Sequence, residues 1–261
     1  VRVTIDWVAR RYVHDDLLTH PPLKASVRKY NAHVHKQNHE VIKRWEEHGV
    51  KFTITNIPNS LTSPLTIFRR NHIKLFVIDD TATWIGGVNL FDVAMKWVDF
   101  MVKFTNKKTI DVLSRQYPLV NKNRPKDNYA TTCDDQTTLL VDAGLIGKSI
   151  IYDQALDEIK KANKSILFVS QFLPEHVVLK EIINASKRGV TITVITSNED
   201  YKLFHTYPYK PFYDANKRKL TKASIPISYP PTNVHAKLLM VDDKVAMFGS
   251  HYFVHSGVIL G

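Results

Sequence analysis

Hydrophobic residues recur at two different spacings along this chain, and the two spacings alternate. Residues 150–161 (IIYDQALDEIKK) place apolar side chains three and four positions apart, whereas residues 190–196 (VTITVIT) alternate apolar and polar side chains. The first spacing predicts an amphipathic helix, and the second predicts a half-buried strand. Because helical and strand patterns follow one another along the chain, we expect an α/β fold with mixed β-sheets flanked by helices.

The second half of the chain shows this order most clearly. Pro174 and Glu175 suit the first turn of a helix, and Gly189 suits a helix end. Pro230 and Pro231 then interrupt the chain before the next apolar run. We expect helices at residues 150–161, 174–188 and 212–223, and strands at residues 165–170, 190–196 and 225–229.

The first half repeats part of this order. Its opening residues 1–7 (VRVTIDW) resemble the strand pattern of residues 190–196, a long helical pattern covers residues 26–48, and residues 50–56 predict another strand. The polar residues 121–138 are the best linker candidate. We therefore expect two pseudo-symmetric βα halves, packed as an intramolecular pseudo-dimer. The predicted halves are residues 1–130 and 131–261.

The two chain ends indicate a piece of a longer protein. The chain opens on Val1 without a methionine, inside a strand pattern, and closes on VILG, which is also strand-like. We expect each half to be incomplete at its outer end. Membrane anchors or targeting segments would then lie outside this chain.

A nine-residue string occurs twice and carries candidate chemistry. HIKLFVIDD at residues 72–80 returns as HAKLLMVDD at residues 235–243. The apolar runs LFVI and LLMV predict interior strands. A duplicated core strand needs apolar residues and turn glycines, but it does not need histidine and lysine two positions apart, projecting from one face. A lysine gains nothing from a packed core, whereas it binds phosphate well.

The two strings resemble the phospholipase D superfamily, which is defined by two HxKx4D motifs. The similarity covers nearly the whole chain, and IGGVN at residues 85–89 and VHAKLLMVDD at residues 234–243 are most similar to bacterial cardiolipin synthase-like phosphatidyltransferases. The resemblance implies an enzyme that attacks a phosphodiester and passes through a covalent phosphohistidine. It also implies one active site, formed within a monomer by both halves of the chain.

The resemblance also implies roles for individual residues. Imidazole can act as a nucleophile or as an acid/base near neutral pH, and two ammonium groups can stabilise charge on the non-bridging oxygens. We expect His72 to be the nucleophile and His235 the acid/base, although these two roles could be exchanged. The expected catalytic residues are His72, Lys74, Asp79, His235, Lys237 and Asp242. Both aspartates are expected to stabilise the fold and the local charge without contacting the substrate. The expected substrate-binding residues are Asn89, Ser250 and Tyr252.

Tyr252 departs from the family pattern. The family usually carries asparagine at this position of its second Gly-Ser-x-Asn element, whereas this chain reads GSHYF. A phenol reaches differently from a carboxamide, which puts the role of this position in doubt and raises the chance of impaired catalysis.

No cofactor or metal is expected, because lysine charge can replace the electrostatic work of a metal ion. The histidine-rich stretch AHVHKQNHE contains His35 and His39 four positions apart, but no third ligand completes a site, so we expect an exposed polar helix face. The single cysteine, Cys133, excludes an internal disulfide and is expected to be passive.

The net charge of +11 favours a polyanionic partner without choosing among polyanions. Phosphatidyl transfer on anionic phospholipid at a membrane surface is the first hypothesis, because residues 204–219 (FHTYPYKPFYDANKRK) mix aromatic and cationic side chains. A nuclease acting on DNA or RNA is the alternative, and a non-catalytic phosphate-binding relative is the third. We expect a cytoplasmic protein, peripheral to the membrane or anchored in it.

Overall fold

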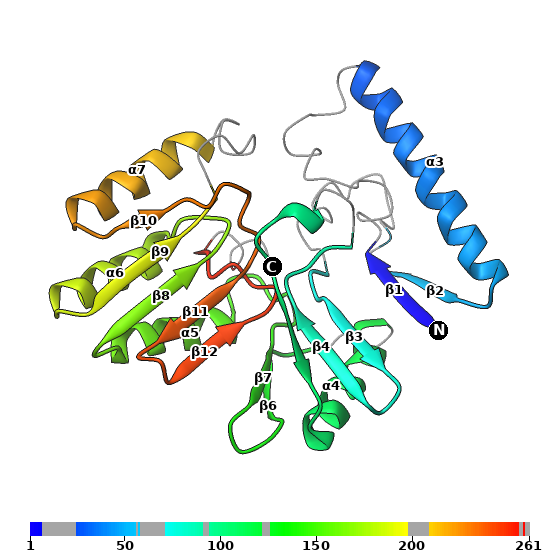
Figure 1. Cartoon of the computed structure of the whole chain (residues 1–261), viewed down its shortest axis with the longest axis horizontal. Coiled ribbons are helices and arrows are strands. Elements are labelled where there is room, and N and C mark those ends of the chain that lie inside the picture. The colour runs from blue at the N-terminus through cyan, green and yellow to red at the C-terminus, as the bar shows by residue number, and fades with distance from the viewer. Residues whose placement is uncertain are drawn as a thin grey trace. The chain divides into compact units, whose positions relative to one another are not determined.

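The protein has the predicted mixed α/β architecture, with several sheets flanked by helices (Figure 1). The computed structural model describes residues 1–6, 25–55, 57, 71–90, 94–121, 126–197, 209–255 and 258. The chain divides into two compact units. Unit 1 comprises Val1–His72 and Pro118–Arg124, and unit 2 comprises Ile73–Tyr117 and Pro125–Gly261. The division into halves at residues 130 and 131 follows the sequence repeat and stays a prediction, as does their pseudo-symmetry.

Unit 1 is built on a parallel strand pair joined through a long helix. Strand β1 (Arg2–Asp6) pairs with β2 (Lys51–Thr55), and helix α3 (Ala25–Glu47) precedes β2 in the chain. Helix α3 ends where Gly49 adopts a φ of 82°, a conformation that glycine accepts without steric cost. These elements match the predicted strand, helix and strand within two residues.

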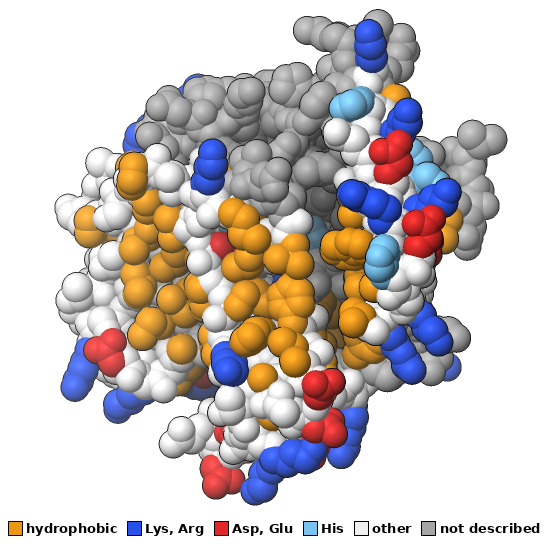
Figure 2. Space-filling view, turned by 45° about the vertical axis from the view of Figure 1, so that its right-hand side comes forward, with side chains coloured by type: hydrophobic (Ala, Val, Ile, Leu, Met, Phe, Trp, Pro, Cys, Tyr) orange, Lys and Arg blue, Asp and Glu red, His pale blue; other side chains and the backbone are white. Residues whose placement is uncertain are grey.

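Helix α3 carries the histidine-rich stretch of the sequence. His33 and His39 are exposed and His35 is half-buried. Ion pairs one turn apart, Lys36–Glu40 and Lys43–Glu47, line the same helix. The lysine, glutamate and histidine side chains along this helix are visible at the right of Figure 2.

Unit 2 contains a five-stranded mixed sheet in the order β10-β9-β8-β11-β12 (Figure 1). Strands β8, β9 and β10 run parallel, and β11 is antiparallel to both β8 and β12. Strand β11, the apolar run of the second motif, is therefore an interior strand as predicted. The bounds are β8 (Ser165–Val169), β9 (Thr191–Ile195), β10 (Ile227–Ser228), β11 (Leu238–Val241) and β12 (Val245–Phe248).

Helices cover this sheet and close the main hydrophobic core. Helix α5 packs against α6 and β11, and α6 packs against β9. The core takes alternate residues of each strand, for example Phe168 and Val194, as the two-residue period of a strand requires. The helices are α5 (Ile150–Lys161), α6 (His176–Lys187) and α7 (Tyr209–Lys222).

Local sequence explains the helix ends. The Ser149 hydroxyl accepts a hydrogen bond from the Tyr152 backbone N–H at 3.0 Å, which caps α5 at its first turn. Helix α5 spans the predicted residues, and α6 and α7 differ from their predicted bounds by one to three residues.

The first motif leads into a three-stranded antiparallel sheet, also in unit 2. Strand β3 (Leu75–Ile78) pairs with β4 (Ala82–Gly86), which pairs with β5 (Met101–Phe104). Among the described residues, β3 lies at the edge of this sheet and Val77 and Ile78 are exposed, so the prediction of an interior strand was wrong for this part of the structure. A continuous apolar run does not distinguish an interior strand from an edge strand. Rows of hydrophobic side chains are visible on the face of the protein in Figure 2.

The polar linker candidate contains regular structure. Helix α4 (Lys107–Asn121) precedes it, and a hairpin of β6 (Tyr129–Thr132) and β7 (Thr138–Val141) forms at its second end. Cys133 is buried in the loop of this hairpin, where burial raises the pKa of its thiol. A thiol in this state is a packing group rather than a nucleophile.

Two further expectations concern the chain ends and the membrane. The strand expected over VILG was wrong at its first residue, because Val258 is helical.

Among the described residues, no helix combines the length and the apolarity that crossing a bilayer requires. Most of the lysine- and tyrosine-rich stretch that begins at Phe204 falls in α7, whereas residues 204–208 lie outside the described part of the chain.

Candidate functional site

The histidine and lysine of the second motif lie in an extended segment immediately before β11. The backbone N–H groups of His235 and Ala236 both donate to the carbonyl of Val98, at 2.8 and 3.0 Å. One residue earlier, Val234 donates to the Ser197 hydroxyl at 2.9 Å, and that hydroxyl donates to the Val234 carbonyl at 3.0 Å. These bonds fix the backbone of His235 between two separate parts of unit 2.

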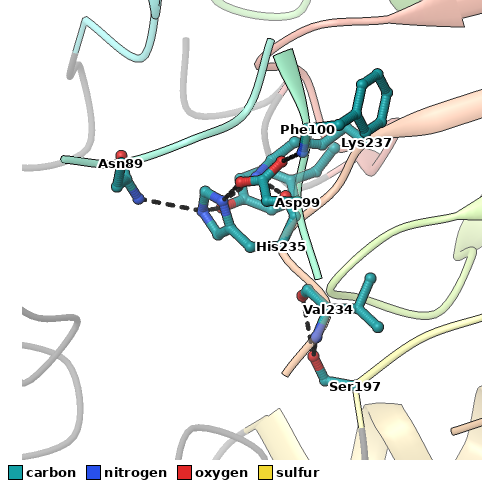
Figure 3. A network of polar contacts seen from close by, with 8 residues as sticks. Asn89, Asp99, Phe100, Ser197, Val234, His235 and Lys237 are labelled. Carbon is teal, nitrogen blue, oxygen red and sulfur yellow. Dashed lines mark hydrogen bonds and ion pairs between the residues drawn. The ribbon is translucent and has the colours of Figure 1, made fainter. Parts of the chain in front are cut away.

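The imidazole of His235 is paired with a carboxylate that the sequence interpretation missed. Its Nδ1 lies 2.7 Å from Oδ2 of Asp99, and both side chains are only 5% exposed (Figure 3). The other oxygen, Oδ1, accepts a hydrogen bond from the Phe100 backbone N–H at 2.8 Å. Because a carboxylate offers no proton, we assign the Nδ1 proton to His235, which leaves Nε2 as the acceptor nitrogen.

Gly87 makes room for this carboxylate. A Cβ atom on Gly87 would lie 2.3 Å from Oδ1 of Asp99, which is closer than any real contact. A side chain at this position would therefore displace Asp99 from His235. The sequence did hold a signal for Asp99: it lies within WVDF, among apolar residues, and a carboxylate in such a setting needs a partner.

The environment keeps His235 neutral in the free protein. Burial lowers the pKa of His235 below its ordinary value of 6.5, and the positive charges of Lys237 and Lys74 act in the same direction. The Asp99 carboxylate opposes these effects and raises the pKa. Lys74 of the first motif thus helps to lower the pKa of His235 in the second motif.

Lys237 is almost completely enclosed, with 1% of its surface exposed. Its ammonium group donates to the backbone carbonyl of His235 and lies 3.0 Å from Nδ1 of the same residue. It also lies 4.1 Å from the centre of the Tyr252 ring, in the geometry of a cation–π contact. A buried ammonium group paired in this way is positioned to attract an anion.

The Nε2 atom of His235 faces two polar groups. The Tyr252 hydroxyl lies 3.1 Å from Nε2, and the Asn89 side-chain amide nitrogen lies 3.4 Å from it (Figure 3 shows the contact with Asn89). The Trp97 ring packs beside the imidazole, with 5.3 Å between ring centres. Asn89 belongs to the first half of the sequence, so residues from both halves meet at this histidine.

The aspartates of the two motifs lie apart from this cluster. Asp242 follows β11, and its carboxylate accepts hydrogen bonds from the backbone N–H groups of residues 163–165, which lower its pKa below 3.8. Asp79 is exposed in the turn between β3 and β4, with a φ of 47°. Both positions fit a structural role in the turn that follows the motif strand.

Two other predicted site residues are placed less specifically. His72 is half-buried and belongs to unit 1, whereas His235 belongs to unit 2, so the convergence of the two histidines stays a prediction. Ser250 is half-buried in the bend that follows β12. The described residues contain no group of three histidine, cysteine or acidic side chains that could hold a metal ion.

Comparison with known proteins finds a family model that matches the part of the chain that carries the second motif. Residues 155–258 match the model of the family described as "Cardiolipin synthase, PLD-like domain". The chain contains a phospholipase D-like domain. This finding agrees with the predicted resemblance for the residues around the second motif, whereas the first motif lies outside the matched range.

Individual relatives agree with this assignment. Cardiolipin synthase 2 of Staphylococcus epidermidis is 26% identical over 206 residues, covering 71% of this chain and 41% of the relative. Cardiolipin synthase of Alkalihalophilus pseudofirmus is 22% identical over 208 residues, covering 71% of this chain and 40% of the relative. The chain therefore spans about two fifths of the length of the curated relatives that it matches.

A solved structure supports the fold. Phosphatidylserine synthase of Haemophilus influenzae Rd KW20 superposes with a TM-score of 0.50 at 13% identity, covering 93% of this chain and 71% of the solved chain. At this identity the likeness concerns the fold alone.

Proposed function

We propose that this protein is a metal-independent phosphodiesterase of the phosphatidyltransferase type, which acts on phospholipids through a covalent phosphohistidine. The observation that carries the proposal is the buried cluster of His235, Asp99 and Lys237. It joins the imidazole and the ammonium group of the second motif to a carboxylate that lies 136 positions before His235 in the sequence. The cardiolipin synthases among the relatives support phospholipid as the substrate class.

The proposed reaction has two balanced steps. In the first, Nε2 of His72 attacks phosphorus, the bond to the leaving alcohol breaks, and that alcohol takes a proton delivered from His235. In the second, an acceptor alcohol or water gives a proton back towards His235 and attacks phosphorus, which releases His72. The roles of the two histidines remain open to exchange.

The charges around His235 support its role as the acid/base. In the free protein the two lysines help to keep His235 neutral. A bound phosphodiester anion offsets their positive charge, and Asp99 stabilises the imidazolium ion, so substrate binding favours proton uptake by His235. The phosphate oxygens would be held by Lys74, Lys237, Asn89 and Ser250. Each such contact would lower the barrier by on the order of 3 kcal/mol.

Product analysis in EDTA tests the proposal. The protein is incubated with phosphatidylglycerol vesicles, and separately with single- and double-stranded DNA. We expect phosphatidyl transfer to a second lipid, which gives cardiolipin and glycerol, or hydrolysis to phosphatidic acid if water is the acceptor. Cleavage of DNA without any lipid product would identify a nuclease instead.

Histidine variants test the mechanism. His72→Ala and His235→Ala should each abolish turnover, whereas His39→Ala, which changes an exposed histidine on α3, should leave it unchanged. Turnover by the double variant of His72 and His235 would refute the proposed chemistry.

A further inference from the structure

The residue that departs from the family pattern lies directly at the reactive nitrogen. The Tyr252 hydroxyl is 3.1 Å from Nε2 of His235, and the two rings meet edge to face with their centres 6.0 Å apart. Since Nδ1 carries the proton that faces Asp99, the phenol donates its hydrogen to Nε2. Any proton that enters or leaves Nε2 along this direction therefore meets the phenol oxygen first.

Packing prevents the phenol from moving aside. The Phe172 ring meets the Tyr252 ring edge to face at 4.9 Å, and the Lys237 ammonium group lies 4.1 Å from the centre of the Tyr252 ring. The Ser170 hydroxyl donates to the Tyr252 backbone carbonyl at 3.3 Å, and Ser170 is fully buried. The hydroxyl hydrogen can rotate, but the ring is held.

We propose that Tyr252 is a catalytic proton relay between His235 and the reacting alcohol oxygen. When the leaving alcohol departs, the imidazolium of His235 gives its Nε2 proton to the phenol oxygen while the phenol gives its own proton to the alcohol oxygen. When the acceptor attacks, both transfers run in reverse, so protons balance over the cycle. This inference rests on the proposed function and extends it.

The surroundings of Tyr252 suit a relay. A positive charge over the ring stabilises the negative charge that develops on the phenol oxygen as its proton leaves. The other group at Nε2, the Asn89 amide, can donate a hydrogen bond but is not a proton shuttle. A relay would give Tyr252 a role of its own at the position where the family pattern has asparagine.

The substitution Tyr252→Phe removes the hydroxyl and keeps the ring and its contact with Lys237. Tyr229→Phe is the matched control, because the Tyr229 hydroxyl also meets a hydroxyl, that of Tyr213 at 3.3 Å, and its ring also faces a lysine, Lys217 at 5.8 Å. Two substrates are compared for each protein: phosphatidylglycerol, whose alkoxide leaving group needs a proton, and bis(p-nitrophenyl) phosphate, whose leaving group does not.

For Tyr252→Phe we expect phosphatidylglycerol turnover to fall about 100-fold or more, which is the usual range for loss of general acid–base catalysis. The first-turnover release of p-nitrophenolate should stay close to that of the wild type, and Tyr229→Phe should behave as the wild type with both substrates. Equal losses with both substrates would show a structural role, and an unchanged phosphatidylglycerol turnover would show no role. Either result overturns the relay while leaving the proposed function intact. A wild-type protein that is inactive on both substrates would instead refute the proposed function, and the relay with it.

Discussion

The substitution Asp99→Asn tests the electrostatic design of the site with the least change of shape. Asparagine has nearly the same volume as aspartate, but it removes the negative charge that lies 2.7 Å from Nδ1 of His235. Because both side chains are only 5% exposed, solvent screens this contact weakly. The expected effects therefore concern both the rate and the ionisation of His235.

The magnitude follows from the kind of contact that is lost. A hydrogen bond to a charged group contributes about 1.5–3 kcal/mol, which corresponds to a decrease of roughly 10- to 150-fold in kcat/KM. The Asp99 carboxylate raises the pKa of His235 against the effect of burial. Its removal should move that pKa further below 6.5.

Two measurements check this prediction. The rate is measured with phosphatidylglycerol vesicles in EDTA, and the pKa of His235 is followed by NMR titration of the free protein. Asp157→Asn, at an exposed position on α5, is the control for loss of one negative charge. An Asp99→Asn protein with unchanged kcat/KM and an unchanged His235 pKa would refute our account of the pair.

Three further predictions concern the support of the site and the stability of the fold. Gly87→Ala should lower kcat/KM about tenfold or more, as Asp99→Asn does, because its Cβ would displace the carboxylate from His235; full activity in a folded variant would contradict this. Asp242→Asn should lower the melting temperature at pH 7, because the ionised carboxylate stabilises the fold. The difference in melting temperature from the wild type should vanish as the pH falls through the depressed pKa of Asp242. A difference that stays constant with pH would argue against the three backbone contacts. His251 is half-buried, desolvation lowers its pKa, and its Nδ1 accepts the Phe253 backbone N–H at 2.9 Å. The wild type should therefore lose stability as the pH falls below 6.5, and His251→Asn should lose less; equal slopes between pH 7 and 5 would contradict this.

The sequence predicted elements well where the signals are local. Helix α5 has a serine cap, helical spacing of apolar residues and lysines in its last turn, and its bounds match the prediction. The position of β3 at a sheet edge, as the described residues have it, could not be predicted, because an apolar run carries no information about how many neighbours a strand has. The β6 strand was missed because its short hairpin lies in a polar stretch whose composition is typical of a linker.

The site shows the same limit at the level of single residues. The repeated histidine and lysine were found because duplication makes them visible, and the fold places His235 and Lys237 within hydrogen-bonding distance of each other. Asp99 occurs once, outside both motifs, and its contact with His235 depends on the pairing of Val98 with Val234. Only the folded chain reveals such a partner. The contact between Tyr252 and His235 likewise comes from packing and not from spacing.

The central claim is that phosphorus becomes bonded to a motif histidine during turnover. The most direct test is to quench the unmodified protein during its reaction with phosphatidylglycerol in EDTA and to map the adduct by peptide mass spectrometry. Our account predicts a phosphatidyl group on His72, or on His235 if the two roles are exchanged. Activity of the unmodified protein that requires a metal ion, with no adduct on either histidine, would contradict it.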